Sequence, residues 1–281
     1  MSVEDTDVEG GGVGGAAPGA VPAGEPARRD STSTVGRALG IIATFREGRA
    51  TQSLSEMSRH ADLPLTTTHR IVVELLAWGA LERTSHGRYR IGLRLWEVAS
   101  LAPRSVALQA VARPYMHDLY EITHYSVHLA VRESFDAVFV ECFRSPDETS
   151  SRPRIGSRYA LHATAVGQVL LAHAPDDVRE EVLSGELRPF TSNTYSSRAE
   201  LQPALDEIAR QGYAISDRQI RPELVSVAAP IAQPSGSVVG ALSLILPYER
   251  ADGTHMVHLV RSTARAISRA LGRQHLTLDE D

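Results

Sequence analysis

The chain has 281 residues, of which 42% are hydrophobic and 22% charged, a composition that excludes a disordered, collagenous or fibrous protein. Its net charge is −5, all 29 basic residues are arginines, and the single cysteine, Cys142, excludes an intrachain disulfide and a thiolate metal cage. The sequence has no run of about 18 apolar residues and no basic N-terminal leader with an apolar stretch. We therefore expect a cytoplasmic protein that makes no membrane contact.

The net charge is distributed unevenly along the chain. Residues 34–100 carry nine arginines against six acids, a net of +3, whereas residues 1–33 and residues 101–281 each carry a net of −4. A basic block between two acidic segments is typical of a nucleic-acid-binding module joined to another domain. Residues 1–33 are rich in Gly, Ala and Pro and have almost nothing to bury, so we expect a disordered tail there.

The basic block begins with two predicted helices. Apolar residues at helical spacing predict a first helix from Thr34 that stops at Gly48. A short second helix is expected after Ser53, because Glu56 stands where a capping box requires an acid. This helix is expected to end near His60.

A third helix and a hairpin follow. Residues 66–78 predict a helix that stops at Gly79, and the tight turn before it completes a helix-turn-helix pattern. The runs 81–83 and 89–91 read as short strands joined by a turn that contains Gly87. Such a hairpin directly after the third helix is a wing.

The exposed face of the third helix and the wing supply the candidate contacts to double-stranded DNA. The helix is expected to bury Thr68, Ile71, Val72 and Leu75, which leaves hydroxyl, imidazole and guanidinium groups outside to reach phosphates or base edges. Wing arginines suit phosphate or minor-groove contacts. The candidates are Thr66, Thr67, His69, Arg70, Arg88 and Arg90. The alternative is that these residues form only a solvated face.

The rest of the chain predicts an α+β domain. Residues 93–102 form a helix that leads away from the wing and is closed by Pro103. The helices expected beyond it are 108–124, 163–173, 176–183, 199–211 and 256–271, and the strands are 126–131, 137–143, 213–217, 225–231 and 238–246. Antiparallel strands grouped with helices are typical of a sensing or binding domain.

Two sets of residues in this domain are candidates for ligand binding. The first lies at a predicted loop-to-helix junction, where small residues leave backbone N–H groups accessible to a carboxylate: Ala163, Thr164, Ala165 and Val166. The second consists of serines on predicted strands: Ser216, Ser226 and Ser243. An inward hydroxyl needs a partner, so these serines either bond to the backbone or converge on one cavity.

Motifs for catalysis or cofactor binding are absent. The sequence has no G-x-S-x-G elbow, no P-loop and no G-x-G-x-x-G motif after a strand. His255 and His258 form an H-x-x-H pair, which offers too few ligands for zinc. We therefore expect no enzymatic activity, no catalytic residue, no metal and no cofactor.

Several segments resemble the IclR family of bacterial transcriptional regulators. In the first half they are TVGRALGIIATF, LSEMSRHADLPLTTTHRIVVELLAWGALER and YRIGLRLWEVA. In the second half they are LHATAVGQVLLAH, PFTSNTY, ELQPALDEIARQGYAISDRQI, VSVAAPI and GALSLILP. The resemblance covers roughly residues 35–272, and it is the shared order and spacing of all the segments that makes it specific.

The resemblance implies a cytoplasmic, effector-responsive regulator that binds palindromic operator DNA as a homodimer or a dimer of dimers. We expect a repressor of a neighbouring catabolic operon. The implied parts are a disordered tail (1–33), a winged helix-turn-helix (34–92), a linker helix (93–103), a GAF-like effector-binding domain (104–274) and a C-terminal tail (275–281).

The family pattern also places the effector at residues 163–166 and the three serines. Members that bind small oxoacids have Gly-Ala where this chain has Ala165 and Val166, Asp at Ser216 and Ser at Ile245. These differences make the pocket less polar. We therefore expect a carboxylate effector larger than a two- or three-carbon acid, such as an aromatic acid.

Two other functions remain open from the sequence. A metabolic enzyme with an accessory DNA-binding-like domain would need a convergent acid, base or nucleophile set. A ligand-binding module whose winged helix mediates only protein contacts would protect no DNA.

Overall fold

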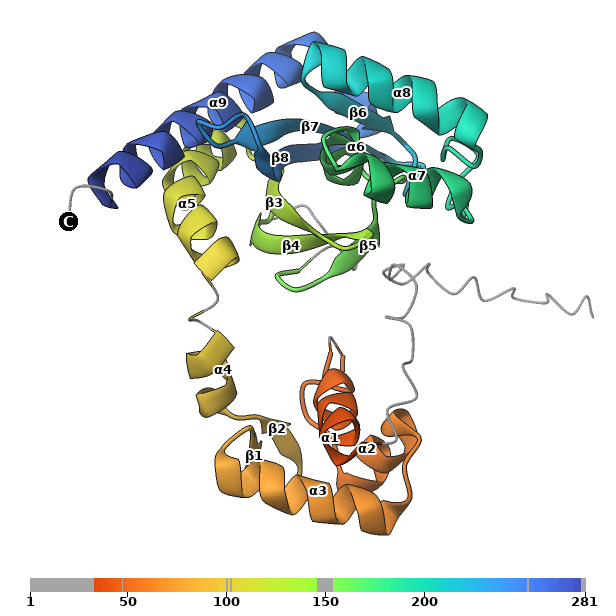
Figure 1. The fold of residues 1–281 in the computed structure, drawn as a ribbon, viewed down its shortest axis with the longest axis vertical. Helices are drawn as coiled ribbons and strands as arrows, with labels where there is room; N and C mark the ends of the chain where they lie inside the picture. Colours follow the sequence, from red (N-terminus) through yellow and green to blue (C-terminus); the bar gives the residue numbers. More distant parts are fainter. Residues whose placement is uncertain are drawn as a thin grey trace, which may run out of the picture.

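The computed structural model describes residues 33–46, 48–99, 101, 103–145, 154–251 and 253–278. In these ranges the chain folds into an N-terminal helical unit with a small hairpin and a C-terminal unit built on a larger sheet (Figure 1). Apart from Ser33, the predicted N-terminal tail lies outside the described residues. No helix in the described ranges is both long and apolar enough to cross a bilayer.

The N-terminal unit is a winged helix-turn-helix, as the sequence predicts. Its elements are α1 (Thr34–Ala43), α2 (Leu54–Ala61), α3 (Leu65–Trp78), β1 (Leu81–Arg83) and β2 (Tyr89–Ile91). The antiparallel pair β1 and β2 forms the wing. The capping box predicted at the start of α2 is present, and α3 ends at a glycine in the left-handed conformation.

Helix α1 ends earlier than the sequence predicts, well before Gly48. The Thr44 hydroxyl donates to the carbonyl of Ile41 at 2.7 Å, which satisfies an acceptor of the last turn. The Gln52 side chain donates to the same hydroxyl, and the Gln52 backbone exchanges two hydrogen bonds with Tyr89 of the wing. The segment after α1 therefore pairs with the wing and does not continue as a helix.

Helices α4 (Leu93–Ala99) and α5 (Pro103–Thr123) connect the two units (Figure 1). The sequence analysis took Pro103 only as the residue that closes the linker helix and started the next helix at Leu108. The structure corrects this, because Pro103 is the first residue of α5. Proline suits that position, since its fixed φ is helical and its missing N–H would have no acceptor within the helix.

The C-terminal unit is built on a six-stranded antiparallel sheet of order β5-β4-β3-β8-β7-β6. Its strands are β3 (Ser126–Glu133), β4 (Asp136–Phe143), β5 (Arg158–Ala160), β6 (Ala214–Asp217), β7 (Leu224–Ala232) and β8 (Val238–Pro247). The sequence analysis missed β5, because a three-residue edge strand that begins with an arginine has no apolar run to reveal it.

Helices cover both faces of this sheet (Figure 1). The helices packed on one face are α6 (Ala165–Ala172), α7 (Asp176–Ser184) and α8 (Arg198–Gln211), and those on the other are α5 and α9 (Gly253–Leu278). A short 3-10 turn, η1 (Tyr248–Arg250), follows β8. Helix α9 extends past the predicted end at Leu271 and takes in part of the segment 275–281, which was expected to be a tail.

All eight residues of α6 are buried, and this helix approaches the preceding loop very closely. A Cβ atom added to Gly167 would lie 2.5 Å from the carbonyl oxygen of Leu161 and 2.7 Å from the Thr164 hydroxyl. Both atoms belong to the turn that enters α6. A glycine is therefore required for α6 to sit this close to the loop.

We predict that Gly167→Ala lowers the free energy of unfolding by about 1–3 kcal/mol, the usual cost of overpacking. Gly40→Ala is the control, because a Cβ at Gly40 meets nothing within 4 Å and alanine favours the interior of α1. Urea unfolding of both variants measures the difference. Equal stability of the two variants would contradict the close approach of α6.

Candidate functional site

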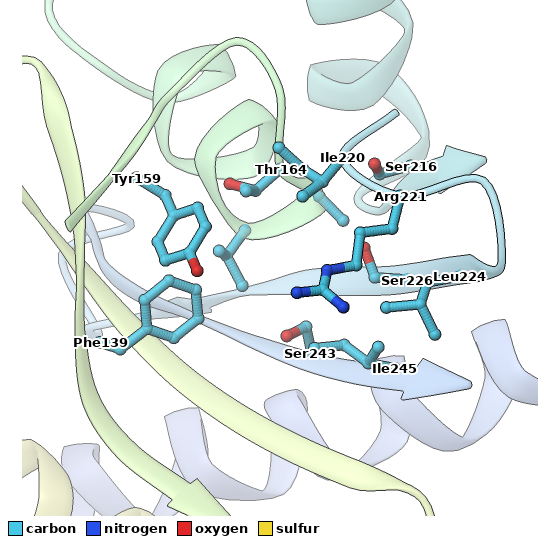
Figure 2. A pocket seen from close by; sticks show the side chains of 12 residues that line it. Phe139, Tyr159, Thr164, Ser216, Ile220, Arg221, Leu224, Ser226, Ser243 and Ile245 are labelled. Atoms are coloured by element: carbon cyan, nitrogen blue, oxygen red, sulfur yellow. The ribbon is translucent and has the colours of Figure 1, made fainter. Parts of the chain in front are cut away.

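A pocket opens between the start of α6, the sheet and the loop that joins β6 to β7 (Figure 2). Its volume is about 70 Å³. Its lining residues are Phe139, Tyr159, Thr164, Ala165, Val166, Ser216, Ile220, Arg221, Leu224, Ser226, Ser243 and Ile245. Six of the seven residues predicted to bind a ligand are among them, so segments far apart in sequence meet at one cavity.

The sheet register brings the predicted serines together. Ser216 on β6 stands opposite Ser226 on β7, and Ser226 stands opposite Ile245 on β8. Ser216 is also bonded to the backbone, because its hydroxyl donates to the carbonyl of Ala163 at 3.3 Å. Ala163 itself is not a lining residue, so its part in the site is to hold Ser216.

The start of α6 forms one wall of the pocket. Thr164 is the N-cap, and its hydroxyl accepts a hydrogen bond from the Gly167 N–H at 3.0 Å. The N–H groups of Ala165 and Val166 belong to the first turn, which has no acceptors within the helix. This wall therefore has a positive electrostatic potential.

Five of the twelve lining residues are not predicted from the sequence, and Arg221 is the most consequential of them. Its guanidinium group points into the pocket (Figure 2), its side chain is 14% exposed, and its Nη1 lies 3.5 Å from the Glu223 carboxylate. An arginine carries little information in a chain that has no lysine. Its position between Ile220 and Leu224 is the signal that could have revealed it.

An aromatic pair forms the opposite wall. The rings of Phe139 on β4 and Tyr159 on β5 meet edge to face, with centroids 5.5 Å apart. Because β5 was not predicted, no sequence pattern placed Tyr159 at the site. The pair supplies apolar surface that suits a planar ring.

Buried polar groups fix the two loops that border the pocket. The Gln168 amide donates to the carbonyl of His162, at 2.8 Å, and to the side-chain oxygen of Gln219. Thr194 donates to the carbonyl of Gln219. His162 is itself buried, and this burial lowers the pKa of its imidazole. The loop before α6 and the loop after β6 are therefore tied to each other through Gln168.

The third helix of the N-terminal unit presents the predicted face. Thr66, His69 and Arg70 are exposed, Thr67 is half-buried, and Thr68 is buried with Ile71 and Val72 as expected. Leu75, which was predicted to be buried, is only half-buried. The N-cap residue of α3 is Pro64, whose side chain makes no capping hydrogen bond. The N-terminal N–H groups of α3 are thus open to an anion.

Arg88 and Arg90, the wing arginines predicted to contact DNA, have acidic partners within the chain. Arg88 donates to Glu56 at 2.7 Å and to the carbonyl of Thr51 at 2.9 Å, which ties the wing to the start of α2. Hydrogen bonds from Ser53 and then the nearby Arg88 charge lower the pKa of the Glu56 carboxyl. Arg90 pairs with Glu82 at 2.8 Å.

The same carboxylate of Glu82 also accepts from the backbone N–H of Leu93, at 2.9 Å. This bond, followed by the Arg90 guanidinium, lowers the pKa of Glu82. Glu82 therefore connects the wing to the first residue of α4.

We predict that Arg88→Ala lowers the Tm of the protein, because it removes the bonds between the wing and α2. Arg70→Ala removes an exposed charge that has no such role, so the Tm should stay unchanged. The slope of log K for double-stranded DNA against log salt concentration should fall in magnitude by about one. Thermal unfolding and fluorescence anisotropy at several salt concentrations measure both quantities. An unchanged Tm for Arg88→Ala would contradict the assigned role.

Comparisons with known proteins agree with this architecture. Residues 34–85 match the model of the IclR helix-turn-helix domain, and residues 101–269 match that of the bacterial transcriptional regulator IclR C-terminal domain. The chain is 28% identical to the HTH-type transcriptional regulator XynR of Escherichia coli K12 over 85% of this chain and 97% of that protein. It is 30% identical to the HTH-type transcriptional repressor AllR of Escherichia coli UTI89 over 90% of this chain and 95% of that protein.

Among solved structures, an IclR homologue from Microbacterium hydrocarbonoxydans in complex with 4-hydroxybenzoate matches with a TM-score of 0.81 and 33% identity. The match covers 85% of this chain and 99% of that one. The two family models span both units, and the structure shows a winged helix-turn-helix and a sheet-based domain with a pocket. These observations lead to one assignment. The chain belongs to the IclR family of ligand-responsive, DNA-binding bacterial transcriptional regulators.

Proposed function

We propose that this regulator represses a neighbouring catabolic operon and that a small organic acid, bound in the C-terminal pocket, releases it from operator DNA. The observation that carries the proposal is a largely apolar pocket bordered by serine hydroxyls and by the positive start of α6. The repressor names of the AllR relatives and the 4-hydroxybenzoate complex of the Microbacterium protein support it.

The lining favours an aromatic acid over a two- or three-carbon acid. Apolar side chains and an aromatic pair occupy most of the wall. The volume of about 70 Å³ is, however, smaller than the roughly 150 Å³ of a cavity that holds benzene. An aromatic ligand therefore needs lining side chains to move as it enters.

Repression of a palindromic operator needs two copies of the chain. Helix α1 exposes Val35 and Leu39, and α4 exposes Leu93, Trp96 and Val98, each by more than half of its surface. Two helices with exposed apolar residues, one in the winged helix-turn-helix and one in the connection that follows it, favour contact with a second copy. We propose a homodimer, or a dimer of dimers, that sets the distance between the recognition helices.

The candidate DNA contacts are Thr66, Thr67, His69 and Arg70 at the start of α3, with Arg88 and Arg90 on the wing. The exposure of the α3 residues supports direct contact. The ion pairs of the wing arginines favour a positioning role, in which they keep the wing at a fixed angle to α2 and to α4.

The proposal predicts a protected palindrome in the promoter beside the regulator's own gene, measured by footprinting with the full chain. Calorimetry is expected to show tighter binding of 4-hydroxybenzoate and related benzoates than of glyoxylate or pyruvate, and the bound benzoate should weaken the footprint. Absence of any protected DNA would overturn the regulatory proposal. Tight binding of glyoxylate or pyruvate alone would overturn the choice of an aromatic acid.

We also predict that Trp96→Ala weakens the response to effector more than it weakens effector binding. An effector shifts the DNA equilibrium only through differential affinity, typically about 1–3 kcal/mol of coupling, and α4 lies between the two units. Gel-shift titrations with and without effector measure the coupling. Ile122→Ala, at an equally exposed apolar residue of α5, is the control. Unchanged coupling in Trp96→Ala contradicts the role of α4.

A further inference from the structure

Two groups at the pocket are able to attract a carboxylate: the start of α6 and the guanidinium of Arg221. We infer that Arg221 holds the carboxylate of the effector and makes the pocket select acids over their neutral analogues. The inference rests on the proposed function, because it assigns a residue to the acid that the proposal places in this pocket.

The position of Arg221 is the first argument. Its side chain reaches from the β6–β7 loop into the cavity, on the side away from Phe139 and Tyr159 (Figure 2). A ring packed against the aromatic pair would therefore direct its carboxylate toward the guanidinium. Ser226 and Ser243 line the pocket on the same side as the guanidinium, so their hydroxyls can add hydrogen bonds to the same carboxylate.

The strength of the charge is the second argument. Arg221 carries a full positive charge on a side chain that is only 14% exposed, and its partner Glu223 is 56% exposed at 3.5 Å. A partly buried guanidinium forms two parallel, charge-assisted bonds with a carboxylate. The start of an eight-residue helix offers about half a charge at most, and the Thr164 hydroxyl already takes the N–H of Gly167.

The third argument is that the loop carrying Arg221 is held in place by buried groups. The side chain of Gln168 donates to Gln219, two residues before Arg221, and Thr194 donates to the Gln219 carbonyl. Thr191 donates to the carbonyl of Arg218 at 2.8 Å. The backbone of the loop is thus fixed in the position that brings the Arg221 side chain to the cavity.

The test compares acids with neutral analogues on the full-length protein. Isothermal calorimetry uses 4-hydroxybenzoate and 4-hydroxybenzamide as the pair of probes. In Arg221→Met, which keeps an unbranched flexible side chain and removes the charge, the affinity for the acid is expected to fall about 10- to 100-fold. The affinity for the amide should change less than about threefold, and Arg221→Lys should retain part of the preference for the acid.

Arg210→Met is the matched control, because it removes the same charge from a side chain on α8 that is 75% exposed and not part of the pocket. It should bind both probes as the unmodified chain does. If Arg221→Met keeps the full preference for the acid, the inference is overturned while the proposed function stands. If the unmodified chain binds no benzoate, the inference and the proposed choice of an aromatic acid are both overturned, while the footprint still decides the regulatory proposal. Circular dichroism shows whether each variant is folded.

Discussion

The close packing of α6 on the sheet is the contact on which the C-terminal pocket depends. Every residue of α6 is buried, and Gly167 lets the helix approach the turn at Leu161. The helix start therefore lies directly over the strands, where the register aligns Ser216, Ser226 and Ile245 in one row. The small side chains at the start of α6 leave a space above that row, so the constraint that packs the helix also creates the pocket.

Much of this arrangement follows from sequence patterns, and the exceptions have physical causes. Periodicity and capping signals predicted α2 and α3 closely, because those signals are local. The predicted end of α1 was wrong, since the segment after this helix is held by Gln52, whose backbone pairs with Tyr89, a residue distant in sequence. Six pocket residues were expected from family positions. Arg221 and Tyr159 were not, because a loop arginine and a three-residue edge strand show no periodicity.

The arginines illustrate why residue type alone does not define a role. Arg88 lies within hydrogen-bond distance of Glu56 and stabilises the wing. Arg70 is exposed on α3, and Arg221 reaches into an apolar pocket. All three occur in a chain whose basic residues are all arginine. Burial and the distance to an acid separate them, and both depend on tertiary structure. The nine arginines of residues 34–100 therefore overstate the number of guanidinium groups that DNA can reach, whereas the net charge of +3 already counts their acidic partners.

The acidic partners of the wing have a further consequence for regulation. Glu82 binds Arg90 of the wing and the backbone of Leu93 at the start of α4, so one carboxylate joins the wing to the linker helix. A displacement of α4 would either break the hydrogen bond between Leu93 and Glu82 or move Glu82 and its strand β1 along with the helix. Leu81 of β1 is buried in the core of the N-terminal unit. Helix α4 is also tied to the end of α3, because Arg94 donates to the carbonyl of Trp78 at 3.1 Å. Any displacement of α4 would therefore act on the wing and on the recognition helix together.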